Sequence, residues 1–271
     1  MTIDPARLFD LSGRVALVTG GGGALGSAVG MGLALSGASV VVVDLQIERA
    51  NEAVEAITAA SGTGRAVAAD MSAPEDIRRV FEGLDVEFGR LDILVNAISA
   101  PIERFRAEDF PLDAWQRMID ANLTSYFLCS QAAARRMIDG GRGGSIINFS
   151  STAGASALGR GSLAYSAAKG GVGQLTRELA FAWAPHQIRV NAVLPCQFIN
   201  SGWAAQIEDP DRRWLVERVV SGIPLGRMGE ADEIVGPILF LASDAASMVT
   251  GVLLPVDGGN LAMNPGATLD W

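Results

Sequence analysis

The sequence has few of the residues from which metal centres and disulfide frameworks are built. Two cysteines, Cys129 and Cys196, and one histidine, His186, occur in 271 residues. Two cysteines cannot form a disulfide framework, so we expect a reducing, cytoplasmic compartment. His186 stands at the end of a helical pattern without a Cys or carboxylate cluster around it. A catalytic zinc needs several such ligands, so we expect no metal site.

Positive charge and long apolar runs are also scarce. The chain has 21 basic and 30 acidic residues, for a net charge of -9. This balance would repel nucleic acid and anionic membranes, so we expect neither as a partner. No apolar run reaches the ~18 residues of a transmembrane helix, and residues 1–13 lack the pattern of a secretory signal.

The chain instead shows a regular alternation of apolar runs and helical patterns. Runs with little polar alternation indicate strands buried on both faces, as in a parallel sheet covered by helices. Strands are expected at residues 14–19, 39–44, 65–69, 91–95, 145–149, 189–193 and 252–256, and helices at 24–36, 47–60, 74–88, 112–138, 163–184 and 230–243. This order predicts a doubly wound α/β fold. No linker or internal repeat divides the chain, so we expect residues 1–271 to form one domain.

Tyr165 and Lys169 lie four residues apart in the segment Tyr-Ser-Ala-Ala-Lys. Residues at this spacing share one face of a helix. Lowering the pKa of a tyrosine from about 10 to neutrality takes about 4 kcal/mol, and a nearby ammonium can supply much of it because it favours phenolate. The pair therefore predicts an acid/base site. The alternative is a half-buried tyrosine beside a solvated lysine.

A glycine-rich turn follows the first expected strand, where residues 19–26 read Thr-Gly-Gly-Gly-Gly-Ala-Leu-Gly. Such a turn before a helix brings backbone N–H groups against a pyrophosphate. Asp44 ends the second strand, 18 residues after Gly26, close to the ~20 expected for the carboxylate that binds an adenosine ribose. A carboxylate there repels a 2′-phosphate, and Leu45, Gln46 and Gly23 are neutral. The sequence therefore favours NAD over NADP.

From residue 11 to residue 260 the chain resembles the short-chain dehydrogenase/reductase family. The matching features are the glycine-rich turn, Asp44, Asp70, Asn96-Ala-Ile-Ser, Asn122, Ser150-Ser151, Tyr165 with Lys169, and residues 189–195, 223–229 and 256–259. The resemblance implies a three-layer Rossmann fold with a seven-stranded parallel sheet, an NAD-dependent oxidoreductase activity and a homotetramer. Because several independent motifs occur in the same order, the match is specific.

The family resemblance also implies residue roles. Tyr165 would exchange a proton with an alcohol or carbonyl, Ser151 would hydrogen-bond the reacting oxygen, and Lys169 would bind the nicotinamide ribose and lower the pKa of Tyr165. Asn122 would anchor a water that links Lys169 to solvent. The cofactor-binding residues implied are Gly20, Gly22, Gly23, Leu25, Gly26, Asp44, Leu45, Asp70, Met71, Asn96, Ala97, Tyr165, Lys169, Pro195, Phe198 and Asn200. Asp70 and Asn96 have a simpler alternative, since such residues often cap a turn.

The chain departs from the family pattern at four places. Ala24 replaces a glycine of the turn, Cys196 stands where a glycine follows Pro195, and Asn200 takes a position often held by threonine. The stretch from Ser151 to Tyr165 is one residue longer than usual, which leaves Ser150 as a rival for the serine role. None of these changes removes a reacting group.

Substrate-binding loops are expected at residues 99–110, 152–162 and 197–222, beyond the carboxyl ends of the strands. Arg104, Arg160, Gln197, Trp203 and Ser151 are the substrate candidates, and arginine side chains suit a carboxylate. A polyol, sugar, sugar acid or hydroxy acid is therefore expected. The alternative for each arginine is a solvated loop charge.

The segment 201–220 reads as a helical flap, with Trp203, Ile207, Trp214, Leu215 and Val219 as apolar anchors. The tail, residues 260–271, is apolar enough that we expect it to dock, either on its own subunit or at a subunit interface.

Two other functions stay open. A 3-oxoacyl thioester reductase would need a basic entrance and a basic 2′-phosphate site. A non-catalytic dinucleotide-binding regulator would not need Asn122, Ser151, Tyr165 and Lys169 together.

Overall fold

The structure, a computed structural model, describes residues 5–263. Seven strands form one parallel sheet in the order β3-β2-β1-β4-β5-β6-β7. The strands are β1 (Val15–Thr19), β2 (Ser39–Asp44), β3 (Thr63–Ala68), β4 (Ile93–Asn96), β5 (Gly144–Phe149), β6 (Ile188–Pro195) and β7 (Leu253–Val256). The predicted doubly wound Rossmann fold is confirmed.

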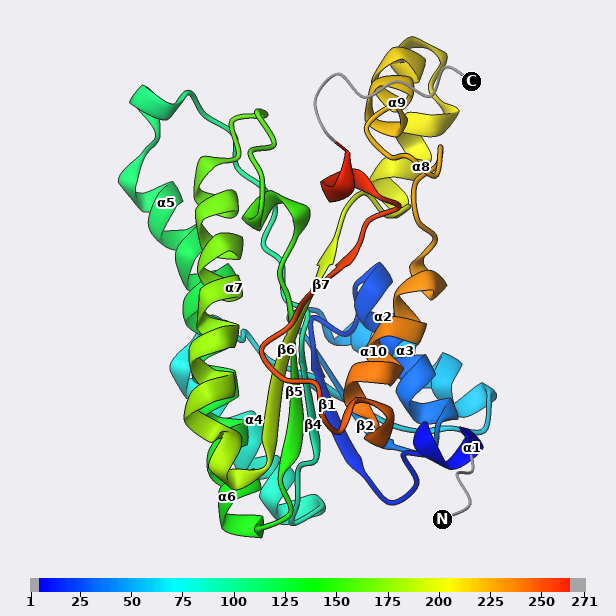
Figure 1. Ribbon diagram of the computed structural model, residues 1–271, viewed down its shortest axis with the longest axis vertical. Coiled ribbons are helices and arrows are strands. Elements are labelled where there is room, and N and C mark those ends of the chain that lie inside the picture. Colours follow the sequence, from blue (N-terminus) through cyan, green and yellow to red (C-terminus); the bar gives the residue numbers. More distant parts are fainter. Residues whose placement is uncertain (1–4, 264–271) are drawn as a thin grey trace.

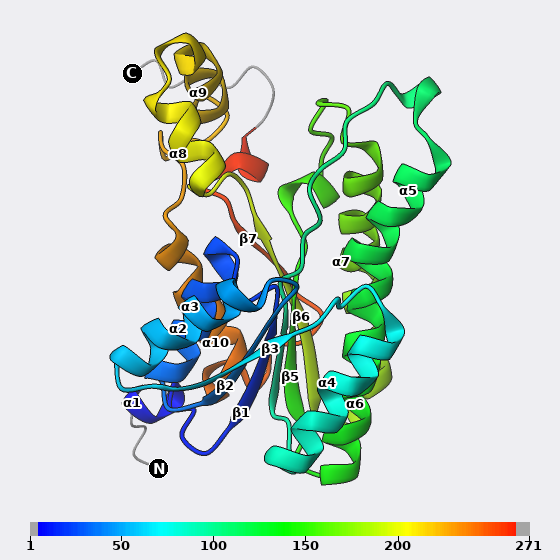
Figure 2. The same cartoon turned by 180° about the vertical axis from the view of Figure 1, so that it is seen from behind.

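Helices cover both faces of the sheet and make three layers. α2, α3 and α10 lie on one face, and α4, α5, α6 and α7 on the other (Figures 1 and 2). The helices are α1 (Pro5–Leu8), α2 (Ala24–Leu35), α3 (Ile47–Ala59), α4 (Pro74–Glu87), α5 (Leu112–Ile119), α6 (Ser125–Gly140), α7 (Leu163–Trp183), α8 (Ser201–Glu208), α9 (Arg213–Val220) and α10 (Val235–Ala242). No helix within residues 5–263 has both the length and the apolar composition needed to cross a bilayer.

The central strands are buried on both faces. Leu17 of β1 pairs with Leu94 of β4, and both belong to the apolar cluster that contains Phe81 of α4. The next residue, Val18, belongs to the cluster on the opposite face, with Leu33 of α2. Alternate side chains of one strand therefore hold both helix layers, which fixes the register of the sheet.

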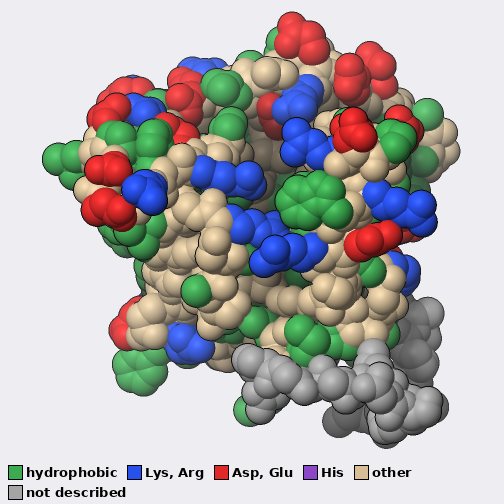
Figure 3. All heavy atoms as spheres, turned by 90° about the horizontal axis from the view of Figure 1, so that it is seen from above, with side chains coloured by type: hydrophobic (Ala, Val, Ile, Leu, Met, Phe, Trp, Pro, Cys, Tyr) green, Lys and Arg blue, Asp and Glu red, His purple; other side chains and the backbone are tan. Residues whose placement is uncertain are grey.

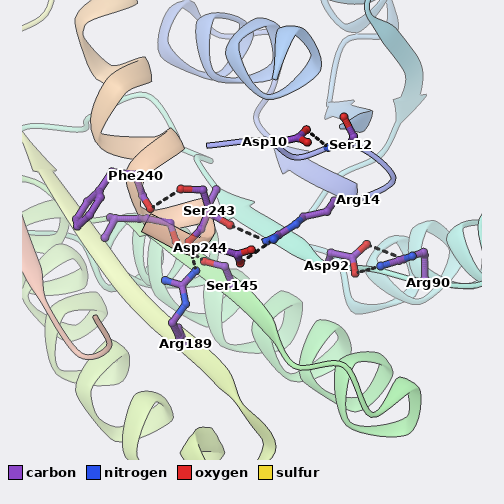
Figure 4. A network of polar contacts seen from close by, with 12 residues as sticks. Asp10, Ser12, Arg14, Arg90, Asp92, Ser145, Arg189, Phe240, Ser243 and Asp244 are labelled. Carbon is purple, nitrogen blue, oxygen red and sulfur yellow. Dashed lines mark hydrogen bonds and ion pairs between the residues drawn. The ribbon is translucent and has the colours of Figure 1, made fainter. Parts of the chain in front are cut away.

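Polar contacts hold together the amino ends of the strands, on the edge opposite the candidate site (Figure 4). Asp92, just before β4, accepts a hydrogen bond from the Val15 N–H at 2.8 Å and pairs with Arg90. Arg14 pairs with Asp244 at 2.7 Å, which ties the end of α10 to the start of β1. These contacts lie at the amino ends of the strands, whereas the loops that carry the candidate site follow their carboxyl ends.

One predicted helix is interrupted. Residues 112–138 were expected to form a single helix, but a π-helical turn at Asp120–Thr124 separates α5 from α6. The Ser125 hydroxyl donates to the Ala121 carbonyl at 2.7 Å, and this kind of side-chain bond bends a helix. Asn122 lies inside the turn, and π turns are frequent at functional sites.

The flap consists of α8 and α9, which stand beyond the carboxyl ends of the strands (Figure 1). Val219 is buried, and Trp203 and Leu215 pack against it. The expected anchoring is wrong for Ile207 and Trp214, which are 46% and 58% exposed. A 3-10 turn at Pro210–Arg212 separates the two short helices, so one apolar face does not continue through both.

The tail begins with a short 3-10 helix, Asn260–Ala262. The Asn260 side-chain amide donates to the Gly222 carbonyl at 2.6 Å, at the base of the flap. Residues 264–271, on which the expected docking of the tail rests, lie outside the described residues.

Candidate active site

A cleft of about 1160 Å³ opens at the carboxyl ends of the strands. The segments that follow six successive strands, β1 to β6, contribute to its wall, including Gly20, Asp44, Asp70, Ala97, Ser151 and Gln197. The strand order reverses between β1 and β4, and ligands of open α/β sheets bind at such switch points. The cleft therefore brings most of the predicted site residues together.

The glycine-rich turn leaves no room for a side chain at Gly20, Gly21, Gly22 and Gly26, and at Gly20 and Gly26 the nearest obstacle is backbone. Gly20 has a φ of +67°, and a Cβ there would lie 2.8 Å from the Ala97 carbonyl oxygen. A Cβ on Gly26 would lie 2.3 Å from the Gly20 carbonyl oxygen. Gly23 caps α2 without a side-chain hydrogen bond, so the N–H groups of the first helical turn face the cleft without a side-chain acceptor. These groups fit a pyrophosphate.

Asp44 lies beside the glycine-rich turn. Its carboxylate accepts hydrogen bonds from the Gly22 N–H at 3.0 Å and the Gln46 N–H at 3.1 Å. Both oxygens keep lone pairs that can accept ribose hydroxyl groups. Arg49, on the first turn of α3, lines the same region. It brings a positive charge near Asp44 that the neutral residues Leu45 and Gln46 do not provide.

Ser151, Tyr165 and Lys169 line the inner part of the cleft. Ser151 is buried at the end of β5, and its Oγ accepts the Ala153 N–H at 3.1 Å. Burial raises the pKa of Tyr165, and a hydrogen bond with Ser151 opposes that rise. The phenol therefore carries its proton near neutral pH.

Lys169 is the only lysine of the sequence, and its side chain is buried. Its Nζ donates to the Phe149 carbonyl at 2.8 Å and to the Tyr126 hydroxyl at 2.9 Å, and lies 5.8 Å from the centre of the Tyr165 ring. Burial lowers the pKa of Lys169 to about 7. Burial opposes the charged form of each group, so it raises the pKa of Tyr165 and lowers that of Lys169.

Ser150 and Ser151 are the two candidates for the serine that hydrogen-bonds the reacting oxygen. The Ser150 hydroxyl donates to the Lys169 carbonyl at 2.8 Å, which ties β5 to the helix that carries the lysine. Ser151 instead bonds with Tyr165. The geometry favours Ser151 as the residue that meets the reacting oxygen.

Asn122 and Asn96 do not line the cleft. Asn122 is fully buried, its side-chain amide donates to the Met118 carbonyl at 3.1 Å, and its Oδ1 has no partner within the described chain. The side chain of Asn96 donates to Asn148 at 2.9 Å and to Ser130 at 3.1 Å. Asn96 therefore ties β4 to β5 and α6, and its side chain points away from the cleft in which the cofactor is expected.

The other predicted cofactor residues have mixed positions. Asp70 lines the cleft and also caps a turn, because its carboxylate accepts the Ser72 N–H at 2.9 Å. The Asn200 side chain accepts the Trp203 N–H at 3.0 Å and so caps α8. Gly22 does not line the cleft, but its N–H donates to Asp44, which does. The other predicted residues that line the cleft are Gly23, Leu25, Leu45, Met71, Pro195, Phe198, Gln197 and Trp203.

Arginines gather at the mouth of the cleft. Arg104 and Arg160 line a neighbouring hollow of about 560 Å³, and the Phe105 N–H donates to the Gly161 carbonyl between their loops. The pKa of Arg160 is lowered by burial and then by repulsion from Arg104 and Arg218. Figure 3, which looks onto this end of the molecule, shows basic side chains around a hollow. No carboxylate within residues 5–263 forms an ion pair with Arg104, Arg160 or Arg218.

Sequence reasoning did not find Arg49, Tyr126 or Arg218. Arg218 is on α9, and only the fold of the flap brings it toward Arg160. Tyr126 lies four residues after Asn122 and offered one signal, its place on the helix that carries Asn122. In the described part of the chain, no group of three or more His, Cys, Asp and Glu residues is placed to hold a metal.

The family model for "Enoyl-(Acyl carrier protein) reductase" matches residues 22–260. The chain is 36% identical over 256 residues to a D-threitol dehydrogenase of Mycolicibacterium smegmatis, covering 93% of this chain and 94% of that protein. The chain belongs to the short-chain dehydrogenase/reductase family. It is also 36% identical over 257 residues to a 2-dehydro-3-deoxy-D-gluconate 5-dehydrogenase of Escherichia coli, covering 94% and 98%.

Solved structures of this family share the fold and contain both kinds of nicotinamide cofactor. A gluconate 5-dehydrogenase of Burkholderia cenocepacia in complex with NADP and tartrate has a TM-score of 0.87 and 31% identity, covering 96% of this chain and all of that chain (100%). An NAD+-bound xylitol dehydrogenase has a TM-score of 0.86 and 29% identity, covering 92% and 99%. The protein is thus an oxidoreductase of this family, and its glycine cradle fits a nicotinamide dinucleotide.

The cradle gives a first testable prediction. Gly26→Ala would force a methyl group against the Gly20 carbonyl, so we expect at least about tenfold weaker dinucleotide binding, because a fixed backbone oxygen cannot give way. Gly30→Ala in the same helix is the matched control, since its Cβ would meet the Ile57 side chain at an ordinary 3.6 Å. The measurement is calorimetric titration with NAD and NADP. Equal affinity in both variants would contradict the crowding of Gly26.

Proposed function

We propose that the protein is an NAD-dependent oxidoreductase that moves hydride between the nicotinamide and a secondary alcohol or ketone of a small polar substrate. Polyols, sugars, sugar acids and hydroxy acids are the substrate class, and sugar acids fit best. The observation that carries the proposal is the convergence of Ser151, Tyr165 and Lys169 on one cleft. The relatives act, by their names, on D-threitol and on 2-dehydro-3-deoxy-D-gluconate.

The chemistry assigned to the chain is a proton transfer. When bound, the cofactor accepts or supplies the hydride. Tyr165 takes the proton of an alcohol, or gives its proton to a carbonyl, and Ser151 donates a hydrogen bond to the reacting oxygen. Because burial raises the pKa of Tyr165, the phenol is ready to donate near neutrality. Alcohol oxidation requires the phenolate, so its rate should rise with pH while the rate of carbonyl reduction falls.

Replacing the phenol tests this assignment. Tyr165→Phe should lower turnover by about two to four orders of magnitude, the usual contribution of a positioned acid or base, while dinucleotide affinity changes little. The measurement is NADH absorbance over a panel of xylitol, threitol, gluconate and tartrate, from pH 6 to pH 10. Activity that survives this substitution would refute Tyr165 as the acid/base.

Cofactor preference depends on Asp44. Its carboxylate favours the ribose hydroxyls of NAD and repels a 2′-phosphate, whereas Arg49 at the same end of the cleft offsets part of that repulsion. We expect the wild type to bind NAD more tightly than NADP, and Asp44→Asn to narrow the difference by about tenfold. Arg49→Gln is the companion variant and should weaken NADP binding alone. Tighter NADP binding by the wild type would overturn the proposed preference.

The basic mouth supports an anionic substrate. Arg104, Arg160 and Arg218 come from three separate segments, and Arg160 is repelled by the other two, so a substrate carboxylate would relieve that repulsion. The same basic mouth is the specific observation that favours the second candidate, a 3-oxoacyl thioester reductase, because its acyl carriers are anionic. The names of the relatives favour the sugar-acid substrate.

A pair of variants on one helix separates these possibilities. Arg218→Met should lower kcat/KM for gluconate about tenfold more than for xylitol, because only gluconate carries a carboxylate. Arg213→Met on the same helix is the control, since Arg213 is 82% exposed and pairs with Glu217. Acetoacetyl-CoA is assayed in parallel. Turnover of that thioester above the turnover of every sugar acid would transfer the assignment to the second candidate.

A further inference from the structure

A second tyrosine contacts the lysine of the site. Tyr126, on α6, is fully buried, and its hydroxyl accepts a hydrogen bond from Lys169 Nζ at 2.9 Å. The same hydroxyl donates to the Ile98 carbonyl at 2.8 Å. Ile98 belongs to the segment after β4 that lines the cleft. One side chain therefore links the lysine to a wall of the cofactor cleft.

The ammonium needs these acceptors because it is buried without a carboxylate. The Phe149 carbonyl and the Tyr126 hydroxyl take two of its three protons, which leaves one. Nζ also lies 4.5 Å from the centre of the Tyr126 ring, closer than its 5.8 Å from the Tyr165 ring. An ammonium near an aromatic face gains further stabilisation.

We propose that Tyr126 is a positioning residue that fixes Lys169 Nζ, and with it the Ile98 segment, so that the third N–H of the ammonium points into the cleft. The inference rests on the proposed function, because it assumes that Lys169 acts there. Nothing in the sequence motif of Tyr165 and Lys169 assigns this role to Tyr126.

The groups that face Lys169 are all neutral. Tyr126 comes from α6, Tyr165 from the same helix, and a backbone carbonyl from β5. Burial raises the pKa of Tyr126 well above its usual value, and burial also raises the pKa of its neighbour Cys129 to about 12. Among the residues described, Lys169 forms no ion pair with a carboxylate. Burial moves the pKa of Lys169 down and that of Tyr126 up, so Lys169 is the group here that we expect to titrate near neutral pH.

Removing the hydroxyl isolates its effect. Tyr126→Phe keeps the ring but takes away one acceptor of the ammonium, so the pKa of Lys169 should fall further. Lys169 is the only lysine, and Tyr126 and Tyr165 are the only two tyrosines. NMR of protein labelled at lysine Cε therefore follows a single side chain.

The expected result is a Lys169 midpoint about one pH unit lower than in the wild type, the size of a charged hydrogen bond. We also expect the alkaline limit of kcat to move by the same amount, with little change in substrate KM. Cys129→Ala, one turn away on α6, is the control and should leave the midpoint in place. An unchanged Lys169 midpoint and an unchanged pH profile in Tyr126→Phe would contradict the proposal, because Tyr126 would then only pack in the core.

The wild-type protein provides a measurement that does not depend on whether the variant folds. With tyrosine labelled at Cζ, the Tyr126 signal should shift at the same midpoint as the Lys169 signal, and Tyr165→Phe assigns the two tyrosine signals. A Tyr126 signal that ignores the Lys169 titration would overturn the proposal. If the wild type turns over no substrate but the two signals titrate together, the proposed function fails and the positioning contact stands.

Discussion

The site is organised around an ammonium that is buried with no carboxylate to pair with it in the described chain. Desolvation lowers the pKa of Lys169 to about 7, so its charge depends on neutral acceptors that are held in place. The Phe149 carbonyl comes from β5, the Tyr126 hydroxyl comes from α6, and the lysine itself comes from α7. The packing of one helix layer on the sheet therefore sets the electrostatics of the cleft.

Other contacts transmit the same constraint to the backbone. The Ser150 hydroxyl binds the Lys169 carbonyl, so the carboxyl end of β5 fixes the helix turn that carries the lysine. Asn96 bonds to Asn148 in the neighbouring strand and to Ser130 in α6. These buried polar contacts pin β4 and β5 to α6 and α7 at the level of the cleft. Buried hydrogen bonds of this kind specify a geometry that apolar packing alone does not, although Asn96 Oδ1 has no partner within the described residues.

The fold was largely predictable from the sequence, because each apolar run had one consistent interpretation. All seven strands were found, with bounds that differ by at most two residues at either end. The site was predictable where a local motif carries it, as for Gly26, Asp44 and Tyr165 with Lys169. It was not predictable where side chains meet through tertiary packing. The partner of Tyr126 depends on how α6 crosses α7, and the approach of Arg218 to Arg160 depends on the flap.

A net charge of -9 and a basic cleft mouth act over different distances. At physiological salt, charges separated by more than about 8 Å are largely screened from each other. An approaching anion therefore responds to the chain's net charge only weakly, and to Arg104, Arg160 and Arg218 strongly once it reaches the mouth. Because Arg104 and Arg218 repel the partly buried Arg160 guanidinium, Arg160 gains more from an anion than an isolated arginine would. Under the proposed sugar-acid specificity, an acidic protein would select an anionic substrate without attracting nucleic acid, since selectivity would depend on three neighbouring side chains rather than on the overall field.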